Sequence, residues 1–196
     1  MSEENLNPII QFKEWFNLAS SKEINDPNAM CLSTVSSDHK PHSRMVLLKD
    51  FGEDGFVFYT NYESNKGKDI ILNSNVCLNF HWKSLLRQVR IEGVVEKLSD
   101  ETSNNYYNSR HYLSRIGAWA SDQSRVLENR EELEKKIEFY KNKYPDEKSV
   151  PRPAYWGGFL VRHKRIEFWQ DMPHRIHQRE VFEIKDNTWN SFKLSP

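Results

Sequence analysis

Between Ala29 and Leu98 the chain carries a series of short segments rich in β-branched and aromatic residues, each followed by turn-forming residues. The segments are AMCLSTV, RMVLLKDF, GFVFYTN, NVCLNFHW and RQVRIEGVVEKL. The separators include Ser36-Ser37-Asp38 and the pair Gly52 and Gly55. Short strands at such hairpin-like spacing predict a mainly antiparallel sheet and argue against β-α-β units.

Apolar residues recur at helical spacing in other parts of the chain. They predict an amphipathic helix over residues 8–22, after a flexible tail of residues 1–7, and a short helix in NKGKDIILNS. Ser99-Asp100-Glu101 is typical of a helix start and leads into TSNNYYNSR. The clearest helical pattern covers residues 124–143.

The C-terminal part returns to strand-like sequence in GGFLVRHKRIEFWQ, REVFEIKD and TWNSFKLSP. The preceding segment DEKSVPRP is the best candidate for a linker, but we expect the strands after it to rejoin the same sheet. We therefore predict an α+β fold, a mainly antiparallel β-barrel with helices packed outside it. Residues 1–24 form a tail and helix in this interpretation, and residues 25–196 form a single domain.

The charge balance excludes several classes of partner. Lys and Arg number 28, as do Asp and Glu, so the formal net charge is zero, which argues against a nucleic-acid binder or a polybasic membrane-surface protein. No apolar run approaches the roughly 20 residues of a membrane helix, and MSEENLNPII lacks the features of a secretory signal. Cys31 and Cys77 show no metal-ligand spacing and the His residues form no HExxH motif, so we expect free thiols, a cytoplasmic location and no metal site.

The glycine-rich signatures of phosphate binding are absent from the sequence, since neither GxGxxG nor GxxxxGK[ST] occurs, and there is no GxSxG elbow. A bound phosphate must therefore be held by side chains. Arg44 and Lys49 bound the segment RMVLLK. In one extended strand they point to opposite faces, so they serve two ligands, or one lies where the strand ends, or they are simply charges that mark strand ends.

Two further segments offer polar groups beside strands. FYTNYESNK joins a strand to a short helix, whose N-terminus favours an anion, although taken alone it is a polar turn. Gln88 shares a strand face with Arg90 and Glu92. Its amide can donate and accept together, as the edge of a heterocycle requires, whereas the Arg–Glu pair is an ordinary surface feature.

Two sets of residues later in the chain are regularly spaced. A hydroxyl, a guanidinium and a second hydroxyl follow at four-residue intervals: Tyr106, Arg110 and Ser114. On one helical face these groups suit a phosphate monoester, although coincidence explains the spacing equally well. Three polar side chains alternate along a predicted strand: Arg175, His177 and Arg179. Such groups are costly to bury without an anionic partner, so this set indicates function as readily as it indicates an ordinary strand.

Seven motifs occur in order along the chain: RMVLLK, FYTNYES, RQVRIEG, IGAWASDQS, WGG, IEFWQ and RIHQR. Together they resemble the pyridoxine/pyridoxamine 5′-phosphate oxidase family, from about Asn25 to Pro196. Each motif alone is weak, but seven in register are specific. The resemblance implies an FMN-binding split β-barrel that dimerises, with FMN at the subunit interface.

The resemblance also implies roles for individual residues. The FMN-binding set is Arg44, Met45, Val46, Leu47, Leu48, Lys49, Tyr59, Thr60, Lys66, Gln88, Gln123, Ser124, Trp169 and Arg179. Gln123 and Ser124 are expected at the start of the long helix, where backbone amides suit an anion. The substrate phosphate is assigned to Lys49, Tyr106, Arg110 and Ser114. The pyridine ring is assigned to Arg175, Ile176 and His177, with Arg175 stabilising charge at the reacting centre and His177 orienting the substrate.

The implied reaction oxidises pyridoxamine 5′-phosphate or pyridoxine 5′-phosphate to pyridoxal 5′-phosphate. A hydride passes to FMN, which dioxygen reoxidises with release of hydrogen peroxide, and the protein positions and polarises the substrate. The alternatives from other classes are a flavin- or pyridoxal-phosphate-binding carrier or sensor, a split-barrel reductase with another substrate, and a single-stranded nucleic-acid binder.

The chain departs from the family pattern at positions near the implied site. Asn65 stands where the family has Arg, and the loss of one charge-assisted bond, about 1.5–3 kcal/mol, predicts weaker FMN binding. His111 replaces a proline, and Arg115 replaces a glutamine and adds a positive charge. Asp171 replaces a glycine and Gln178 replaces an acid, and these changes favour the carrier interpretation.

Overall fold

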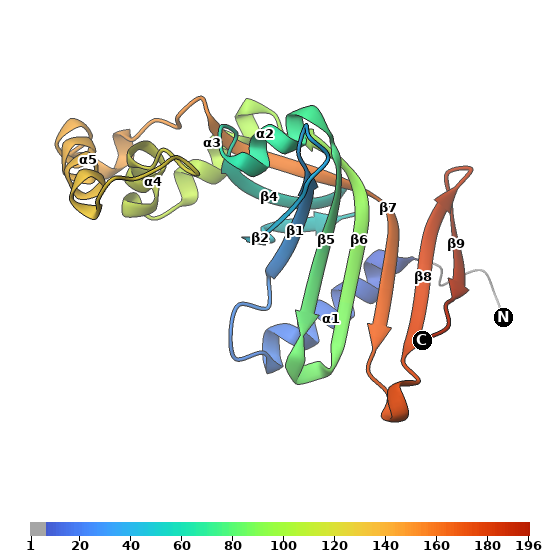
Figure 1. Ribbon diagram of the computed structural model, residues 1–196. Helices are drawn as coiled ribbons and strands as arrows, with labels where there is room; N and C mark the ends of the chain where they lie inside the picture. The colour runs from blue at the N-terminus through green and yellow to red at the C-terminus, as the bar shows by residue number, and fades with distance from the viewer. Residues whose placement is uncertain (1–6) are drawn as a thin grey trace.

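The computed structural model describes residues 7–196, and their strands form one antiparallel sheet accompanied by helices (Figure 1). The strands are β1 (Ala29–Val35), β2 (Pro41–Leu47), β3 (Asp50–Gly52), β4 (Gly55–Asn61), β5 (Asn75–Trp82), β6 (Arg87–Lys97), β7 (Trp156–Gln170), β8 (Gln178–Lys185) and β9 (Thr188–Lys193). The helices are α1 (Pro8–Lys22), α2 (Asn65–Leu72), α3 (Asp100–Ser109), α4 (Tyr112–Ala120) and α5 (Arg130–Lys143). The α+β class and the antiparallel sheet are thus confirmed.

Alternating burial along the strands defines the inner face of the sheet. In β1 every second residue is buried, and Met30 and Leu32 are fully so. Helix α1 covers this face with Phe12, which is fully buried. The Phe12 ring lies 4.9 Å from Phe56 and 5.3 Å from Phe80, centroid to centroid, in edge-on arrangements that favour aromatic packing. The first predicted helix therefore belongs to the core that the sheet builds.

Strand β7 organises the sheet because it is long enough to serve three neighbours. It pairs with β6 along most of its length, with β4 through residues 156–161 and with β8 through residues 165–170. Between these two segments β7 exchanges β4 for β8 as its second neighbour, and a register shift between Glu92 and Gly93 of β6 lies opposite this point. The strands after the predicted linker DEKSVPRP therefore rejoin the same sheet, as expected.

The segment between β2 and β3 joins the two sides of the barrel. The Leu48 N–H donates to the Asn28 carbonyl, and the Lys49 N–H donates to the Val57 carbonyl of β4, each at 2.8 Å. The prediction of one continuous strand over RMVLLKDF is therefore wrong, because the chain leaves β2 after Leu47 to make these bonds. Of the alternatives for Lys49, the structure selects the one in which it follows the strand end.

The predicted helix over residues 124–143 is too long at its start. Helix α5 begins at Arg130, where the Asn129 side chain accepts a hydrogen bond from the Glu132 N–H at 2.9 Å and so forms the N-cap. Ser124 has φ +70°, which is incompatible with a right-handed helix, and Val126 is 96% exposed. Residues 121–129 therefore form turns, since their apolar side chains find no surface to pack against.

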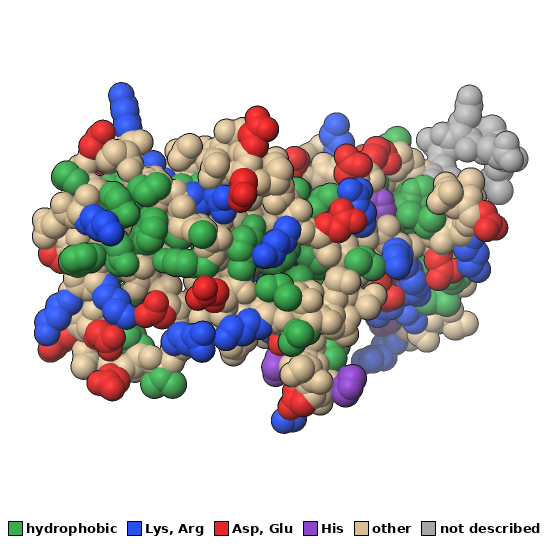
Figure 2. Space-filling view, turned by 90° about the horizontal axis from the view of Figure 1, so that it is seen from above, with side chains coloured by type: hydrophobic (Ala, Val, Ile, Leu, Met, Phe, Trp, Pro, Cys, Tyr) green, Lys and Arg blue, Asp and Glu red, His purple; other side chains and the backbone are tan. Residues whose placement is uncertain are grey.

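The described part of the chain begins at Asn7, next to helix α1. Residues 1–6 of the predicted tail lie outside the described residues, whereas Asn7 caps α1 by accepting from the Ile9 N–H at 2.9 Å. Helices α4 and α5 project from one end of the sheet (Figure 1). Acidic and basic side chains are interspersed over the face seen in Figure 2. Within residues 7–196, no helix has both the length and the apolar character needed to cross a membrane.

Candidate active site

A cavity of about 460 Å³ lies where β2, β4 and α2 meet α3 and α4. Its lining residues are Met45, Val46, Leu47, Lys49, Tyr59, Thr60, Lys66, Tyr106, Arg110, His111, Ser114, Gln123 and Trp156. Three of these side chains are cations, and none of the described lining residues is acidic. A cavity with this charge suits an anionic ligand. We call it the cationic cavity.

Lys66 lies in the first turn of α2, at the base of the cationic cavity. The Ser64 side chain caps this helix by accepting from the Gly67 N–H, and the Lys66 Nζ donates to Ser64 Oγ at 3.2 Å and to Gln123 Oε1 at 2.9 Å. Burial, together with the nearby charge of Arg44, lowers the pKa of Lys66 to about 8. The Lys66 ammonium has no carboxylate partner within residues 7–196, so a bound phosphate would provide the negative charge that balances it.

Arg110 presents a second unbalanced cation. Its Nη1 is buried and has no hydrogen-bond partner among the described residues, and its guanidinium lies 4.6 Å from the centre of the Trp156 ring. Burial lowers the pKa of Arg110 because desolvation disfavours the charged form. A buried donor without an acceptor is costly, and a phosphate oxygen in the cavity would satisfy it. The residues present therefore fit phosphate-bearing ligands such as FMN and a phosphorylated substrate.

Stacked aromatic rings form one wall of the cationic cavity. Tyr59 stacks on Tyr106 with ring centres 3.8 Å apart and on Trp156 at 5.7 Å. The Tyr59 ring approaches β7 closely because Gly158 has no side chain: a Cβ there would lie 2.8 Å from the ring. The WGG motif thus provides a cavity residue, Trp156, and the space for its neighbour. Trp156 was not among the predicted site residues, although its motif was recognised.

The predicted helical face carrying Tyr106, Arg110 and Ser114 is wrong in geometry, although all three line the same cavity. Helix α3 ends at Ser109, and Arg110 has an extended backbone with ψ 149°. The His111 side chain then accepts from the Leu113 N–H at 3.3 Å and caps α4. The three residues therefore converge across a bend between two helices. His111, which sequence reasoning did not assign, joins them because of this cap.

Six residues of the predicted FMN set do not line the cationic cavity: Gln88, Trp169 and Arg179, which lie at the other end of β7, and Arg44, Leu48 and Ser124. Leu48 is 4% exposed and belongs to the core, and Ser124 is exposed on the turn before α5. Arg44 is held by Leu32 O at 3.1 Å and Thr34 Oγ1 at 2.7 Å. The positive charge of Arg44 affects the cavity because it helps to lower the pKa of Lys66. The Arg44 side chain does not line the wall.

The C-terminal set lies around a second cavity of about 570 Å³, whose lining includes Ile176, His177 and Arg179. The predicted strand through Arg175, His177 and Arg179 is wrong, because β8 begins only at Gln178. Arg175 lies in a 3₁₀ turn, η4 (Pro173–Arg175), with φ +62°, and is exposed. The turn is tight because the chain reverses from β7 into β8. We call this cavity the hairpin cavity.

One contact with an aromatic ring and one contact with an acid hold the His177 side chain in the hairpin cavity. Its ring centre lies 4.7 Å from that of Trp169, and its Nδ1 lies 2.8 Å from Asp171 Oδ1. Gln88 pairs with Trp169 in the β6–β7 register, so both belong to the same end of the sheet. Asp171 is not among the described residues with positive φ, so its backbone does not require glycine.

The two cavities are lined by residues at or just beyond opposite ends of β7, the long strand that Figure 1 traces across the sheet. Trp156, the first residue of β7, lines the cationic cavity, and Gln170, its last residue, leads directly into the hairpin. A straight strand of 15 residues spans about 45 Å at roughly 3.3 Å per residue. One chain therefore does not bring its two sets of predicted residues together.

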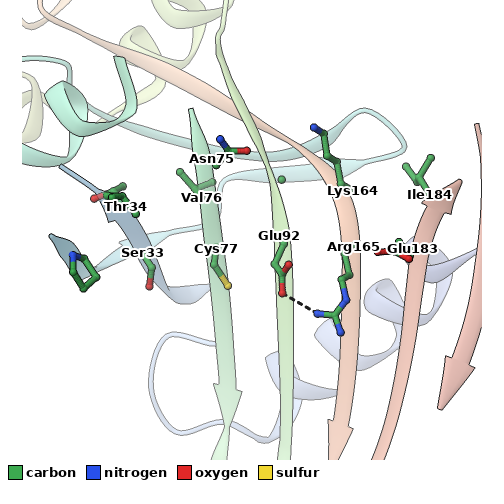
Figure 3. A pocket seen from close by; sticks show the side chains of 13 residues that line it. Ser33, Thr34, Asn75, Val76, Cys77, Glu92, Lys164, Arg165, Glu183 and Ile184 are labelled. Carbon is green, nitrogen blue, oxygen red and sulfur yellow. Dashed lines mark hydrogen bonds and ion pairs between the residues drawn. The ribbon is translucent and has the colours of Figure 1, made fainter. Parts of the chain in front are cut away.

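A third cavity, of about 560 Å³, opens on the face of the sheet away from α1 and contains no predicted site residue (Figure 3). An ion pair between Arg165 and Glu92, at 2.8 Å, crosses it. Burial raises the pKa of the Cys77 thiol to about 11, so this group is not a nucleophile near neutral pH. Arg165 and Glu92 neutralise each other, and the cavity also carries one further acid, Glu183, beside one further cation, Lys164. Its described lining therefore has no excess of positive charge for an anion, which makes it a weaker candidate for a ligand site.

The fold and the cationic cavity define a class, the FMN-binding split-barrel proteins. PhzG from Burkholderia lata, solved with tetrahydrophenazine-1-carboxylic acid, superposes with a TM-score of 0.92 at 25% identity, covering 99% of this chain and 95% of that one. An FMN-binding protein of Nostoc punctiforme, related to pyridoxamine 5′-phosphate oxidase, gives a TM-score of 0.76 at 14% identity, covering 100% and 98%. The second match supports the fold alone.

Sequence comparison narrows this class to one family. Residues 19–144 match the family described as pyridoxamine 5′-phosphate oxidase, and residues 156–196 match the pyridoxine 5′-phosphate oxidase C-terminal dimerisation region. A pyridoxine/pyridoxamine 5′-phosphate oxidase of Gloeothece citriformis is 52% identical over 196 residues, which is all of this chain and 91% of the relative. The chain therefore belongs to the pyridoxamine 5′-phosphate oxidase family. The predictions of the family, of an FMN-dependent oxidoreductase and of the split barrel are confirmed.

Proposed function

We propose that the protein converts pyridoxamine 5′-phosphate or pyridoxine 5′-phosphate into pyridoxal 5′-phosphate, with FMN as hydride acceptor and dioxygen as final oxidant, released as hydrogen peroxide. The observation that carries the proposal is the cationic cavity, in which the buried Lys66 and the buried Nη1 of half-buried Arg110 have no acidic partner among residues 7–196. Two phosphate groups, one on FMN and one on the substrate, would balance these charges. A carrier of an unphosphorylated ligand would not need them.

Within the cationic cavity we assign the substrate phosphate to Lys49, Tyr106, Arg110 and Ser114. Arg110 is the strongest of these, because its buried Nη1 lacks any other acceptor among the described residues. Lys66 and Gln123 hold the FMN phosphate end in this assignment, since their side chains already contact each other at 2.9 Å. Met45 and Leu47 of β2, whose apolar side chains are exposed, and the half-buried Val46 between them would contact the ring of FMN.

The hairpin set completes the site from a second subunit in this proposal. Because β7 separates the two cavities, we assign the other half of each site to residues of the partner subunit: Gln88, Trp169, Arg175, Ile176, His177 and Arg179. The match of residues 156–196 to a dimerisation region supports this arrangement, since the hairpin lies within that range. A two-fold homodimer would then contain two equivalent sites.

The chain's own groups have separable tasks at the reacting centre. The exposed guanidinium of Arg175, presented by the tight turn of η4, would stabilise charge that develops at the reacting centre during hydride transfer. His177, held between Trp169 and Asp171, orients the pyridine ring. The aromatic wall of Tyr59, Tyr106 and Trp156 excludes water from one side of the cavity.

An anaerobic flavin spectrum tests the proposal. Purified protein is loaded with FMN and mixed with pyridoxamine 5′-phosphate without oxygen, and the flavin band near about 450 nm is followed. The proposal predicts loss of the band and its return with peroxide on admission of air. A flavin that stays oxidised would favour the carrier interpretation, and unphosphorylated pyridoxamine is the control for the phosphate contacts.

A further inference from the structure

Glu167 of β7 is a buried acid that none of the roles above uses. It is 2% exposed, yet it lies on the same face of the sheet as Trp169, because the two residues are separated by one position in a strand. Arginines from three strands converge on it: Arg90 Nη2 donates to Oε2 at 2.7 Å, Arg165 Nη2 lies 3.5 Å from Oε2, and Arg179 donates to Oε1. Glu167 is thus the centre of a cluster of charges.

The contact with Arg179 is the most constrained of the three, because two guanidinium nitrogens share one carboxylate oxygen. Arg179 Nε and Nη2 both lie 2.7 Å from Glu167 Oε1, and Arg179 Nη1 donates to the Ser195 carbonyl at 3.1 Å. A guanidinium has five N–H groups, so these contacts fix its plane and leave two N–H groups for a ligand. Arg179 also lines the hairpin cavity and pairs with Trp169 in the β7–β8 register.

The charge balance shows why Glu167 matters for this geometry. The cluster contains three arginines and two acids, Glu167 and Glu92, but Glu92 contacts only Arg165, at 2.8 Å, and Arg90, at 3.4 Å. Glu167 is therefore the acid that pairs with Arg179 on the sheet. Without it, three guanidinium groups would face one another across neighbouring strands, and repulsion would turn Arg179 away from its present orientation.

We propose that Glu167 is a positioning residue for the cofactor: it orients Arg179 so that the two free N–H groups of this arginine bind FMN. The inference rests on the proposed function, which places Arg179 in the site, and on the family resemblance, which assigns this arginine to FMN. Glu167 itself does not touch the ligand in this scheme. Its effect on FMN affinity must therefore pass through Arg179, and this is what distinguishes positioning from a general contribution to folding.

A double-mutant cycle on FMN affinity tests the proposal. FMN is titrated into the dimeric apoprotein of the wild type, Glu167→Gln, Arg179→Met and the double variant, with flavin fluorescence as the readout. We expect Arg179→Met to raise the Kd about tenfold to hundredfold, the range of one charge-assisted hydrogen bond, and Glu167→Gln to raise it about tenfold. In the Arg179→Met background, Glu167→Gln should change the Kd by less than about twofold.

A matched control and a second variant complete the experiment. Glu92→Gln makes the same chemical change in the same cluster, but Glu92 does not contact Arg179, so FMN affinity should change by less than about twofold. Arg179→Lys keeps the charge but cannot place two donors on one oxygen, so its Kd should approach that of Arg179→Met. This variant tests orientation even if Glu167→Gln fails to fold.

Each contrary outcome overturns a different step. Equal losses from Glu167→Gln in both backgrounds, or an Arg179→Lys variant with native affinity, would overturn positioning. Native FMN affinity in Arg179→Met would overturn the role of Arg179, and the inference with it. A wild-type protein that binds no FMN would instead overturn the proposed function.

Discussion

The cationic cavity and the hairpin cavity differ in how the chain builds them. The cationic cavity gathers residues from β2, β4, α2, α3 and α4, and its cations lack acidic partners among the described residues. In the hairpin, by contrast, two of the polar side chains have acidic partners, since Arg179 contacts Glu167 and His177 contacts Asp171, and only Arg175 of the three predicted polar residues is exposed. The first region is prepared to receive an anion, whereas the second holds Arg179 and His177 in fixed positions. The difference indicates a binding half and a positioning half.

The largest effect on activity is expected at Arg175, the exposed cation of the hairpin. Arg175→Ala should lower kcat/KM by about 10²–10³-fold, the usual loss when a group that stabilises developing charge is removed. FMN content should change much less, because Arg175 is assigned to the substrate. Stopped-flow reduction of the flavin and its absorbance after purification measure the two effects, and equal losses would mean that Arg175 is structural.

Arg110 tests the binding half. Arg110→Ala removes a charge-assisted contact to the substrate phosphate, about 1.5–3 kcal/mol, and should lower kcat/KM about tenfold to hundredfold, mainly through KM. Steady-state kinetics with pyridoxamine 5′-phosphate measure this loss. The exposed Arg125 is the control, since it lies outside the cavity lining. An unchanged KM would contradict the assignment of the phosphate.

Lys66 should give FMN binding a pH dependence. Its pKa is lowered to about 8 in the free protein, and a bound phosphate would favour the charged form and raise that pKa. Below pH 8 Lys66 is protonated in both states, and its effect on affinity is constant. As the pH rises through 8, the free protein loses the proton, so FMN affinity should fall, by up to about tenfold per pH unit.

Two variants of Lys66 check this slope. Lys66→Arg keeps its charge and should bind FMN with little dependence between pH 8 and 9.5. Lys66→Ala should bind weakly at every pH while the apoprotein keeps its thermal unfolding temperature. Fluorescence titrations over this pH range measure the FMN affinity of each variant. If the affinity of Lys66→Arg fell with pH as steeply as that of the wild type, Lys66 would not be the group that binds the phosphate.

The smallest effect is expected at Asn65, the exposed residue that precedes Lys66 in α2. Asn65→Arg restores a cation beside the proposed FMN phosphate, and the exposed position limits the gain to a few-fold in affinity. Titration at low and high salt measures it, since screening should reduce the gain. A variant with weaker FMN binding would show that the phosphate lies elsewhere.

Local sequence patterns predicted most of the elements, and the family resemblance supplied most of the lining residues. Alternation along the strands and helical spacing in residues 8–22 survive in the fold because neighbouring residues determine them. The set of Tyr106, Arg110 and Ser114 was found through its spacing, although the cap at His111 bends the chain between them. Composition alone predicts neither the site residues nor the ligand. Both predictions came from the family resemblance of the seven ordered motifs.

What the sequence did not reveal depends on contacts between distant residues. The turns at 121–129 replace a helix because Val126 has nothing to pack against, which no local pattern reports. The sequence did not identify Glu167 as the partner of Arg179, because the two residues lie on different strands and only the strand register brings them together. The separation of the cavities follows from the length of β7, which becomes meaningful only when its neighbours are known.

Subunit complementation tests the central claim, that each site combines the cationic cavity of one chain with the hairpin of its partner. Arg110→Ala and Arg175→Ala are purified, each with low activity, then unfolded, mixed in equal amounts and refolded together. A shared site predicts that activity returns to about a quarter of the wild-type value, because half of the dimers are mixed and each mixed dimer holds one intact site. If each site belonged to a single chain, every site would carry a substitution and the mixture would stay as inactive as its parents.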